Sequence, residues 1–264
     1  MHWQSKTILL LVVPWTAGYV LLQTHWWLRA GTPGAGAAGA AITASLMYST
    51  VQYPYQTSWL HGGLLPLLAV FLLTYAATKI GRPKKERLGT AEPKRGRNAA
   101  QVAANLGIAA LVAIPRIMAH PGTREGDTQG EWSQLFAMAA LAEAAADTVS
   151  SEIGQVFGGQ PRMFTTLRRV EPGTDGGVTL LGTAAGVLAA ALVAAIAAWT
   201  MQAGWLEFGF VTVGGAFGLL FDSLLGATLE RKGWLNNDAV NFLSTLSAVL
   251  APLAVIALFV RFRL

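Results

Sequence analysis

The chain has 264 residues, of which 53% are hydrophobic and only 12% are charged. This balance excludes an ordinary soluble domain and is typical of an integral membrane protein. The net charge of +5 comes from basic residues clustered in short segments, so it does not indicate a nucleic-acid partner. The absence of cysteine excludes disulfides, zinc thiolates and thiol nucleophiles.

Apolar stretches of about 20 residues, the length that crosses a bilayer as a helix, recur along the chain. They predict an all-α, polytopic bundle of about eight transmembrane helices, with roughly seven to nine as the bounds, in one membrane-embedded domain over residues 1–264. The first stretch runs past the length of a signal-peptide core, so we expect it to be retained. The expected spans are residues 7–24, 34–52, 60–79, 100–119, 132–151, 177–201, 206–228 and 238–260.

Basic residues gather between alternate spans, and the positive-inside rule places those segments in the cytoplasm. We expect a basic cytoplasmic loop over residues 80–99, interpreted as a patch that faces lipid headgroups, and a second cytoplasmic loop over residues 152–176. In a bacterial source the membrane would be the inner one. The basic residues are Arg82, Lys84, Lys85, Arg87, Lys94, Arg95 and Arg97, then Arg162, Arg168 and Arg169, then Arg231 and Lys232.

Carboxylates interrupt the span over residues 132–151 at its cytoplasmic end. Such groups are costly in lipid and usually mark a functional site. Glu143, Asp147 and Ser151 are spaced by four and share one helix face, which Glu152 extends. Paired carboxylates at this spacing can hold Mg²⁺, which commonly bridges to substrate phosphates. The alternative, strongest for Glu143, is a structural acid that pairs with an arginine or hydrogen-bonds to a neighbouring helix.

The span over residues 206–228 carries Gly214, Gly218, Asp222 and Gly226 at intervals of four. Small residues at this spacing let helices approach closely, which would press Asp222 and the adjacent Ser223 towards the acids of residues 132–151. We therefore expect Asp147, Glu152 and Asp222 to be catalytic residues and metal ligands. The alternative is a packing seam in which Asp222 is a tolerated polar residue.

A glycine-rich segment stands before the span over residues 177–201. Backbone N–H groups at a helix start bind phosphate readily, and nearby hydroxyl and guanidinium groups would add to this site. The spacing is not that of a Walker loop, and a plain turn is the alternative. The expected nucleotide-phosphate residues here are Thr165, Thr166, Arg168, Arg169, Gly173, Thr174, Asp175, Gly176 and Gly177.

Two further polar sets open helices on the same face. Asn237 and Asn241 fall one turn apart and are expected to bind metal or nucleotide, although helix capping is an alternative for Asn236 and Asn237. The other set is expected to bind substrate or to be structural, and consists of Arg97, Asn98, Gln101 and Asn105. We expect the same of Glu143 and Ser223. Gly182 and Gly186, within residues 177–201, are interpreted as a helix-packing motif.

Taken in order, these motifs resemble a family of integral membrane proteins that includes the plant phytyl-phosphate kinase of vitamin E synthesis. The resemblance covers residues 35–260 and leaves residues 1–30 as a lineage-specific first helix. This chain departs from the family pattern at Val149 and Ser150, where an aromatic residue is common. The motifs are Arg97-Asn-x-x-Gln-Val-x-x-Asn105, Asp147-Thr-x-x-Ser-Glu-Ile-Gly154, Pro172-Gly-Thr-Asp-Gly-Gly-Val178, Asp222-Ser-Leu-Leu-Gly-Ala-Thr228 and Asn236-Asn-Asp-x-Val-Asn241.

Membership of this family implies phosphorylation of an isoprenyl monophosphate to its diphosphate by a nucleoside triphosphate. It implies that the site includes Asp147, Glu152, Asp175, Asp222, Asn237 and Asn241. A more distant similarity to CTP-dependent dolichol and phytol kinases and to phosphatidate cytidylyltransferase favours CTP as donor, with ATP as the alternative. The expected partners are Mg²⁺, an isoprenyl phosphate and membrane lipids, and the assembly stays open between a monomer and a homodimer.

Three other functions stay open. The chain could be a kinase of a free lipid alcohol or a cytidylyltransferase, both of which would use the same acids. It could also be an ion-coupled transporter or lipid scramblase, because intramembrane carboxylates suit transport. Against transport, the polar residues gather at one membrane face and no inverted repeat is visible.

Overall fold

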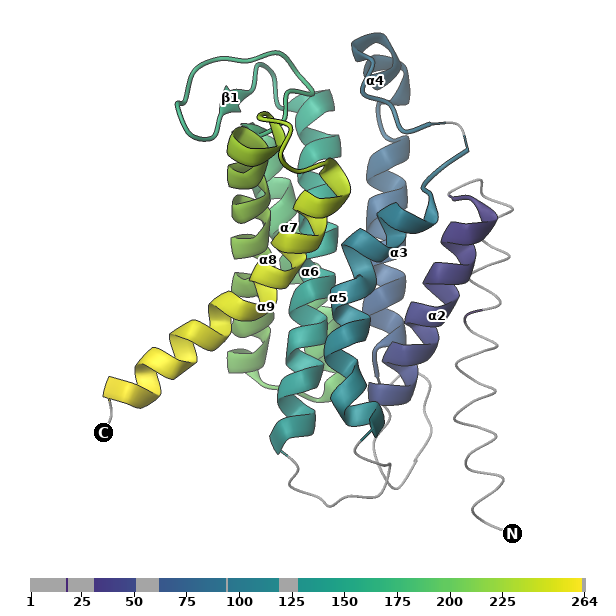
Figure 1. Ribbon diagram of the computed structural model, residues 1–264, viewed down its shortest axis with the longest axis vertical. Helices are drawn as coiled ribbons and strands as arrows, with labels where there is room; N and C mark the ends of the chain where they lie inside the picture. The colour runs from purple at the N-terminus through teal and green to yellow at the C-terminus, as the bar shows by residue number, and fades with distance from the viewer. Residues whose placement is uncertain (1–17, 19–30, 51–61, 94, 119–127, 263–264) are drawn as a thin grey trace.

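The computed structural model describes residues 18, 31–50, 62–93, 95–118 and 128–262, which fold as an α-helical bundle (Figure 1). The first expected span, residues 7–24, lies outside these residues except for Gly18. Only a short hairpin interrupts the helices, in which β1 (Arg162–Met163) pairs antiparallel with β2 (Gly177–Val178). The helices are α2 (Pro33–Thr50), α3 (Leu64–Lys79), α4 (Arg82–Leu88), α5 (Ala99–Met118), α6 (Thr128–Phe157), α7 (Leu180–Met201), α8 (Trp205–Leu225), the π-helical turn η1 (Gly226–Glu230) and α9 (Asn237–Phe262).

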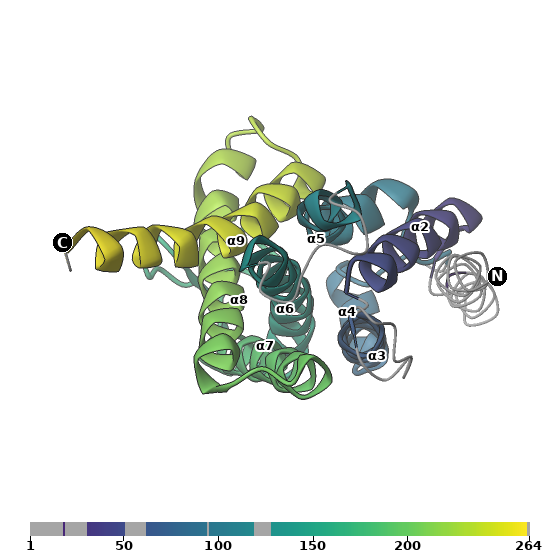
Figure 2. The same ribbon diagram turned by 90° about the horizontal axis from the view of Figure 1, so that it is seen from below.

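Helix α6 is the centre of the bundle and contacts α3, α5, α7, α8 and α9 (Figure 2). Its middle, residues 137–146, is buried on every side, and alanine dominates it. A helix that is apolar all round belongs in an interior, and small side chains let five neighbours approach it closely. At 30 residues the helix is about 45 Å long, whereas a bilayer core is about 30 Å thick. The helix is therefore longer than a bilayer core is thick.

The glycine stripe of α8 is a packing seam, as one reading of the sequence predicted. A Cβ added at Gly214 would lie 2.7 Å from the Ala248 carbonyl oxygen of α9, and one at Gly218 would lie 2.4 Å from Cγ of Glu143 on α6. The prediction that Gly182 and Gly186 pack helices is also confirmed. A Cβ at Gly186 would lie 2.6 Å from the Ala146 carbonyl oxygen. These close approaches bring α6, α7, α8 and α9 together.

The expected number of membrane spans is not confirmed. Among the described residues two helices are long and apolar enough to cross a membrane, namely α7 and the continuous α8–η1 unit. A third is added if α3 and α4, which bend by 65° at their junction, are taken as one span. The remaining long helices are richer in small or polar residues. In α6 this reflects burial, because its surface faces other helices over much of its length.

The segments between the expected spans are more ordered than plain loops. Residues 80–99 contain α4, whose junction with α3 is Gly81 in the left-handed conformation (φ 63°). Residues 152–157 belong to α6, so the expected loop over residues 152–176 begins only after Phe157 and then forms the β1–β2 hairpin. Helix α7 starts at Leu180, where the Thr179 side chain accepts a hydrogen bond from the Gly182 N–H as an N-cap. The glycine-rich segment is thus separated from the helix start by β2 and Thr179.

Candidate functional site

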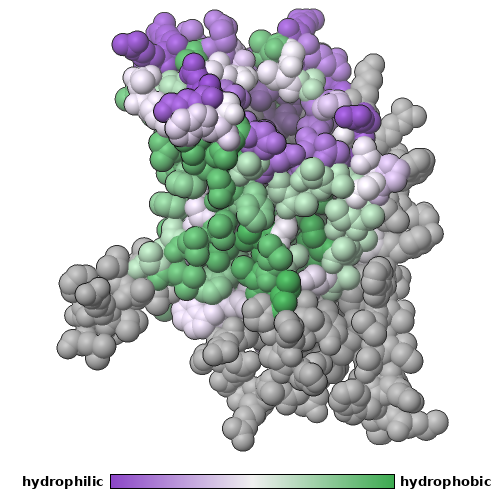
Figure 3. Space-filling view, in the orientation of Figure 1, coloured by the Kyte–Doolittle hydropathy of each residue, from purple (hydrophilic) through white to green (hydrophobic). Residues whose placement is uncertain are grey.

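A polar cavity with a volume of about 450 Å³ lies at one end of the bundle, between α6, α8, α9, the hairpin and the segment after α4. Figure 3 shows that hydrophilic residues gather at the end that carries α4 and β1, around a hollow, above a band of hydrophobic residues. All five of the sequence motifs meet at this cavity. Motif residues that line it include Asp147, Glu152, Gly173, Thr174, Asp175, Gly177, Asp222, Ser223, Asn237 and Asn241, together with Arg97, Gln101 and Asn105.

Asp147 of α6 and Asp222 of α8 lie next to each other in the wall of this cavity. Their carboxyl groups are close enough to interact directly, and Asp147 also interacts with the Arg97 guanidinium. The close seam between α6 and α8 produces this pairing, because Gly218 lies one helical turn before Asp222 and carries no side chain to separate the helices. The paired carboxylates predicted from sequence therefore come from two different helices.

The cavity has a large excess of acidic groups. Of the described residues that line it, Arg97 alone is basic, and it donates a hydrogen bond from Nη2 to Thr148 Oγ1 (3.2 Å). The acidic residues that line it are Glu92, Asp147, Glu152, Asp175, Asp222 and Glu230. Such a concentration of negative charge repels an anionic ligand unless cations accompany it.

Several oxygens of this cavity have no donor. Within the described part of the chain, the buried side-chain atoms that lack a hydrogen-bond partner are Glu92 Oε1, Gln155 Oε1 and Asp222 Oδ2. All three are acceptors, and all three residues line the cavity. Because a buried unpaired acceptor is costly, this arrangement fits a site that receives a cation or a hydrogen-bond donor.

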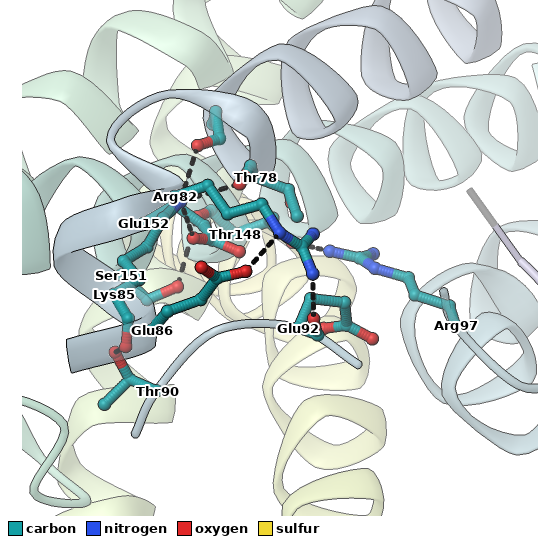
Figure 4. A network of polar contacts seen from close by, with 11 residues as sticks. Thr78, Arg82, Lys85, Glu86, Thr90, Glu92, Arg97, Thr148, Ser151 and Glu152 are labelled. Atoms are coloured by element: carbon teal, nitrogen blue, oxygen red, sulfur yellow. Dashed lines mark hydrogen bonds and ion pairs between the residues drawn. The ribbon is translucent and has the colours of Figure 1, made fainter. Parts of the chain in front are cut away.

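A buried ion pair fixes Glu152. Lys85 of α4 is 1% exposed, and its Nζ donates to Glu152 Oε2 (2.5 Å) and to the carbonyl oxygens of Ala77 (3.0 Å) and Thr78 (2.8 Å). Figure 4 shows this network, in which the α3–α4 bend directs Lys85 towards α6. The interpretation of residues 80–99 as a lipid-facing patch is therefore wrong for Lys85. Glu152 lines the cavity with its charge balanced, which distinguishes it from Asp222.

The α4 region also positions the cavity wall. Arg82 donates to Glu86 Oε1 (2.9 Å) and to the Glu92 carbonyl oxygen (3.2 Å), so it holds the turn that follows α4 (Figure 4). Neighbouring Lys84 donates to the Val156 carbonyl oxygen near the end of α6 (2.5 Å). These contacts hold Thr90 and Glu92 at the cavity, where both line its wall.

The glycine-rich segment packs closely against other parts of the site. Gly173 has φ 85°, and a Cβ there would lie 2.4 Å from Cγ2 of Thr90. Gly176 has φ 69°, and a Cβ there would lie 2.2 Å from the backbone nitrogen of Ala227 in η1. The segment is a turn, as the alternative reading held, and its glycines let it close over α8 and the segment after α4. The same turn places Asp175 on the cavity wall.

Other residues named from sequence lie outside the cavity. Thr165, Thr166, Arg168 and Arg169 are exposed at the hairpin, because the tight turn between β1 and Val170 directs them outwards. Asn98 caps α5 in a reciprocal pair: its N–H donates to Gln101 Oε1 (2.8 Å), and its Oδ1 accepts from the Gln101 N–H (3.0 Å). Asn236 likewise caps α9 by accepting from the Ala239 N–H (2.9 Å), which confirms the capping alternative for this residue.

Glu143 lies deeper in the bundle and is fully paired. Its carboxylate accepts hydrogen bonds from the hydroxyls of Ser244 (2.7 Å) and Thr245 (2.6 Å) on α9, and the residue is 1% exposed. This is the structural alternative considered for it. Glu143 joins α6 to α9 beneath the cavity and does not line it.

Several residues of the site were not predicted from the sequence. Glu230 lines the cavity and interacts with Asp147 and Asp175, yet it precedes a short basic segment and is the last residue of a π-helical turn. Thr148 and Gln155 also lie on the cavity-facing side of α6. Thr148 is one helical turn before Glu152 and Gln155 is two turns after Asp147, so their spacing could have predicted this position. The burial of Lys85 depends on the bend at Gly81, for which the sequence offers only the glycine.

The fold and the cavity together define an α-helical integral membrane protein with an acid-lined polar site at one end of its bundle. The chain belongs to the family described as Integral membrane protein DUF92, whose model matches residues 19–249. No solved structure shows significant similarity to it.

The chain is similar to membrane and chloroplast proteins of other organisms. An uncharacterized membrane protein of Methanocaldococcus jannaschii is 37% identical over 189 residues, which are 69% of this chain and 71% of that protein. The chloroplastic protein VTE6 of Arabidopsis thaliana is 30% identical over 225 residues, 83% of this chain and 65% of that protein. An uncharacterized membrane protein of a Synechocystis species is 32% identical over 187 residues, 69% of each.

Proposed function

We propose that this protein is a kinase that transfers a phosphoryl group from a nucleoside triphosphate to an isoprenyl monophosphate at one face of the membrane. The acid-rich cavity carries this proposal, because its unpaired buried oxygens and its excess of carboxylates call for bound cations. The likeness to VTE6 supports phosphoryl transfer to an isoprenyl monophosphate as the reaction. So does the resemblance to the family, which includes the plant phytyl-phosphate kinase. The site would face the cytoplasm, as the basic segments of the sequence indicate.

The residues of the cavity fit Mg²⁺. This ion is usually held by one or two carboxylates, with waters and substrate phosphates completing its shell. Asp147 and Asp222 supply such a pair, and the unpaired Oδ2 of Asp222 is available as a ligand. Within the described residues no three histidine, cysteine or acidic side chains form a metal-binding group by themselves. When bound, Mg²⁺ neutralises charge on the donor phosphates during transfer.

The protein's own groups then orient the two substrates. Arg97 is positioned to bind the anionic phosphate of the acceptor beside Asp147, while Asn237 and Asn241 offer amide groups to the nucleotide. Asp175 and Glu230 add two further acids near Asp147, which would hold a second cation or exclude free anions. The acceptor oxygen is already anionic at neutral pH, so the transfer needs no strong general base. CTP is the favoured donor and ATP the alternative.

Purified protein in detergent, supplied with Mg²⁺, CTP or ATP and a panel of isoprenyl monophosphates, provides the test. Mass spectrometry of the lipid product should show an isoprenyl diphosphate that is absent from the Asp222→Asn variant. A nucleotidyl-lipid would move the protein to the cytidylyltransferases, and turnover of a free isoprenyl alcohol alone would move it to the alcohol kinases. No product with any donor from folded wild-type protein would overturn the kinase proposal.

A further inference from the structure

A second cavity, here called the apolar groove, lies between α2, α3 and α5 beside the polar cavity. Its walls are mainly hydrocarbon along its length, and small residues leave it open. It is lined by Gly39 and Thr43 of α2, Leu67 and Val70 of α3, and Val102 and Leu106 of α5, among others.

The apolar groove and the polar cavity are continuous. Glu92, Arg97 and Asn105 line both of them. Ala144 of α6 forms part of the groove wall, less than one helical turn before Asp147 in the polar cavity. A molecule in the groove therefore ends within reach of the proposed reaction centre.

Basic side chains stand at the end of the groove that meets the polar cavity. Lys79 and Arg82 line the groove together with Arg97, and the Lys79 Nζ lies 5.1 Å from the centre of the Tyr75 ring. Farther along the groove the lining residues are apolar or carry hydroxyls. Glu92 lines the same end and Arg82 is paired with Glu86, so Lys79 and Arg97 are the basic groups that this end offers to an anionic head. The hydrocarbon walls beyond them suit a hydrocarbon tail.

The groove is long enough for an extended chain. Leu67 and Lys79 both line it and are separated by twelve residues of α3, which is about 18 Å at the rise of an α-helix. This length accommodates several isoprene units in an extended conformation. The narrow, branched outline of an isoprenoid suits walls of valine, leucine and glycine.

We propose that the apolar groove binds the isoprenyl chain of the acceptor, with its phosphate at Arg97 and its tail running along α3 towards Leu67. This assignment rests on the proposed function, since it concerns the lipid substrate of the same site. It makes α2, α3 and α5 the determinants of chain length. Helices α6, α8 and α9 provide the acidic site.

Gly39 offers a way to narrow the groove without disturbing the fold. A Cβ added at Gly39 meets no atom within 4 Å, so a leucine side chain would extend into open space in the groove. Gly39→Leu should lower kcat/KM for a twenty-carbon isoprenyl monophosphate by about tenfold, chiefly through KM. It should change kcat/KM for a five-carbon monophosphate less than about twofold, because a short tail does not reach α2 at this depth.

Gly209→Leu is the matched control. Gly209 is also a helical glycine whose added Cβ meets nothing within 4 Å, but it lies on α8 and lines neither cavity. It should leave the chain-length profile unchanged. Equal loss of activity in both variants, or an unchanged long-chain KM in Gly39→Leu, would overturn the groove assignment while leaving the kinase proposal standing.

A binding measurement separates the two proposals if turnover fails. A twenty-carbon isoprenyl monophosphate with a diazirine at the tail end should cross-link to α2, α3 or α5, and Gly39→Leu should reduce the yield. Such cross-links without diphosphate formation would retain the groove and reject the kinase. Cross-links confined to the outer faces of α7 and α8, or complete displacement of the probe by equimolar phosphatidylglycerol, would reject the groove.

Discussion

Glu143 on α6 and Asp222 on α8 are two acidic residues in neighbouring layers of the bundle, but their surroundings differ. Glu143 lies against Gly218, which is one helical turn before Asp222. Glu143, in the interior, accepts hydrogen bonds from Ser244 and Thr245 and is fully paired. Asp222, at the polar cavity, interacts with Asp147 and leaves Oδ2 without a partner. A carboxylate inside a membrane protein is therefore not by itself a functional residue. The two carboxylates differ in their hydrogen-bond donors: the protein supplies the donors of Glu143, whereas Oδ2 of Asp222 is left for a ligand.

The largest effect should follow removal of charge at the polar cavity. Asp222→Asn or Asp147→Asn should lower kcat about a thousandfold, because each removes a metal ligand from the transition state, and metal coordination contributes several kcal/mol there. The product assay by mass spectrometry measures this. Glu171→Gln, an exposed acid of the hairpin loop outside the cavity, is the control and should retain full activity. Retained activity in both cavity variants would contradict the proposed site.

The next effect concerns the paired acid at the edge of the cavity. Lys85→Met should reduce the free energy of unfolding by about 3 kcal/mol, because it removes the buried counter-charge of Glu152, whose side chain is 12% exposed. Unfolding in mixed detergent measures the loss. The double variant with Glu152→Gln should recover part of it.

Lys84→Met is the matched control for Lys85. Lys84 is exposed and makes a hydrogen bond to the Val156 carbonyl, so its loss should cost about 1 kcal/mol or less. Equal free energies of unfolding in Lys85→Met and Lys84→Met would show that the ion pair with Glu152 adds no more to stability than an exposed hydrogen bond does.

A smaller effect should separate the interior acid from the cavity. Thr245→Val removes one donor from Glu143 while keeping the shape of the side chain, so it should destabilise the protein by about 1–2 kcal/mol. The kcat of the folded fraction should stay within about twofold of wild type, since Glu143 does not line the cavity.

Thr212→Val provides the comparison for Thr245. Thr212 donates only to the Phe208 carbonyl of its own helix, so its replacement should have little effect on stability. A loss of kcat in Thr245→Val that exceeds its loss of stability would place Glu143 in the reaction.

The smallest effect is expected for the arginines of the hairpin. Arg168→Ala and Arg169→Ala should change kcat/KM less than about twofold, because both side chains are exposed outside the cavity and are screened by solvent. Arg97→Ala should raise the KM for the lipid phosphate about tenfold, since Arg97 alone is basic among the described residues that line the polar cavity. Steady-state kinetics would compare the hairpin variants with Arg97→Ala. A larger effect in the hairpin variants would indicate that the hairpin arginines bind the phosphate.

Helix positions and the meeting of the motifs were accessible from sequence. Apolar runs locate α3, α5, α7 and α9 to within a few residues, and the parity of the spans brings Asp147, Asp222 and Asn241 to one end. Glycine spacing also indicates the seam that joins α6 to α8. These features depend on local sequence or on the order of the helices, so a single sequence is enough to predict them.

Other features depend on tertiary geometry that has no local signature. Lys85 is buried because the chain bends by 65° at Gly81, where a Cβ would lie 2.5 Å from the Val156 side chain. Glu230 enters the cavity through the π-helical turn η1, which changes the helical phase after Asp222. Arg168 and Arg169 carry the right chemistry for phosphate, but the hairpin directs them outwards. The number of spans is not confirmed within the described residues, where small and polar helix surfaces such as that of α6 are buried against protein.

Binding of Mn²⁺ in place of Mg²⁺ tests the contrast between the two acidic centres most directly. Electron paramagnetic resonance titration of Mn²⁺ in the presence of CTP would compare wild-type protein with Asp222→Asn and Glu143→Gln. We expect the apparent Kd to rise about tenfold or more in Asp222→Asn, because one of two protein ligands is lost, and to change less than about threefold in Glu143→Gln. Equal weakening in both variants, or unchanged binding in Asp222→Asn, would contradict the assignment of the polar cavity as the metal and nucleotide site.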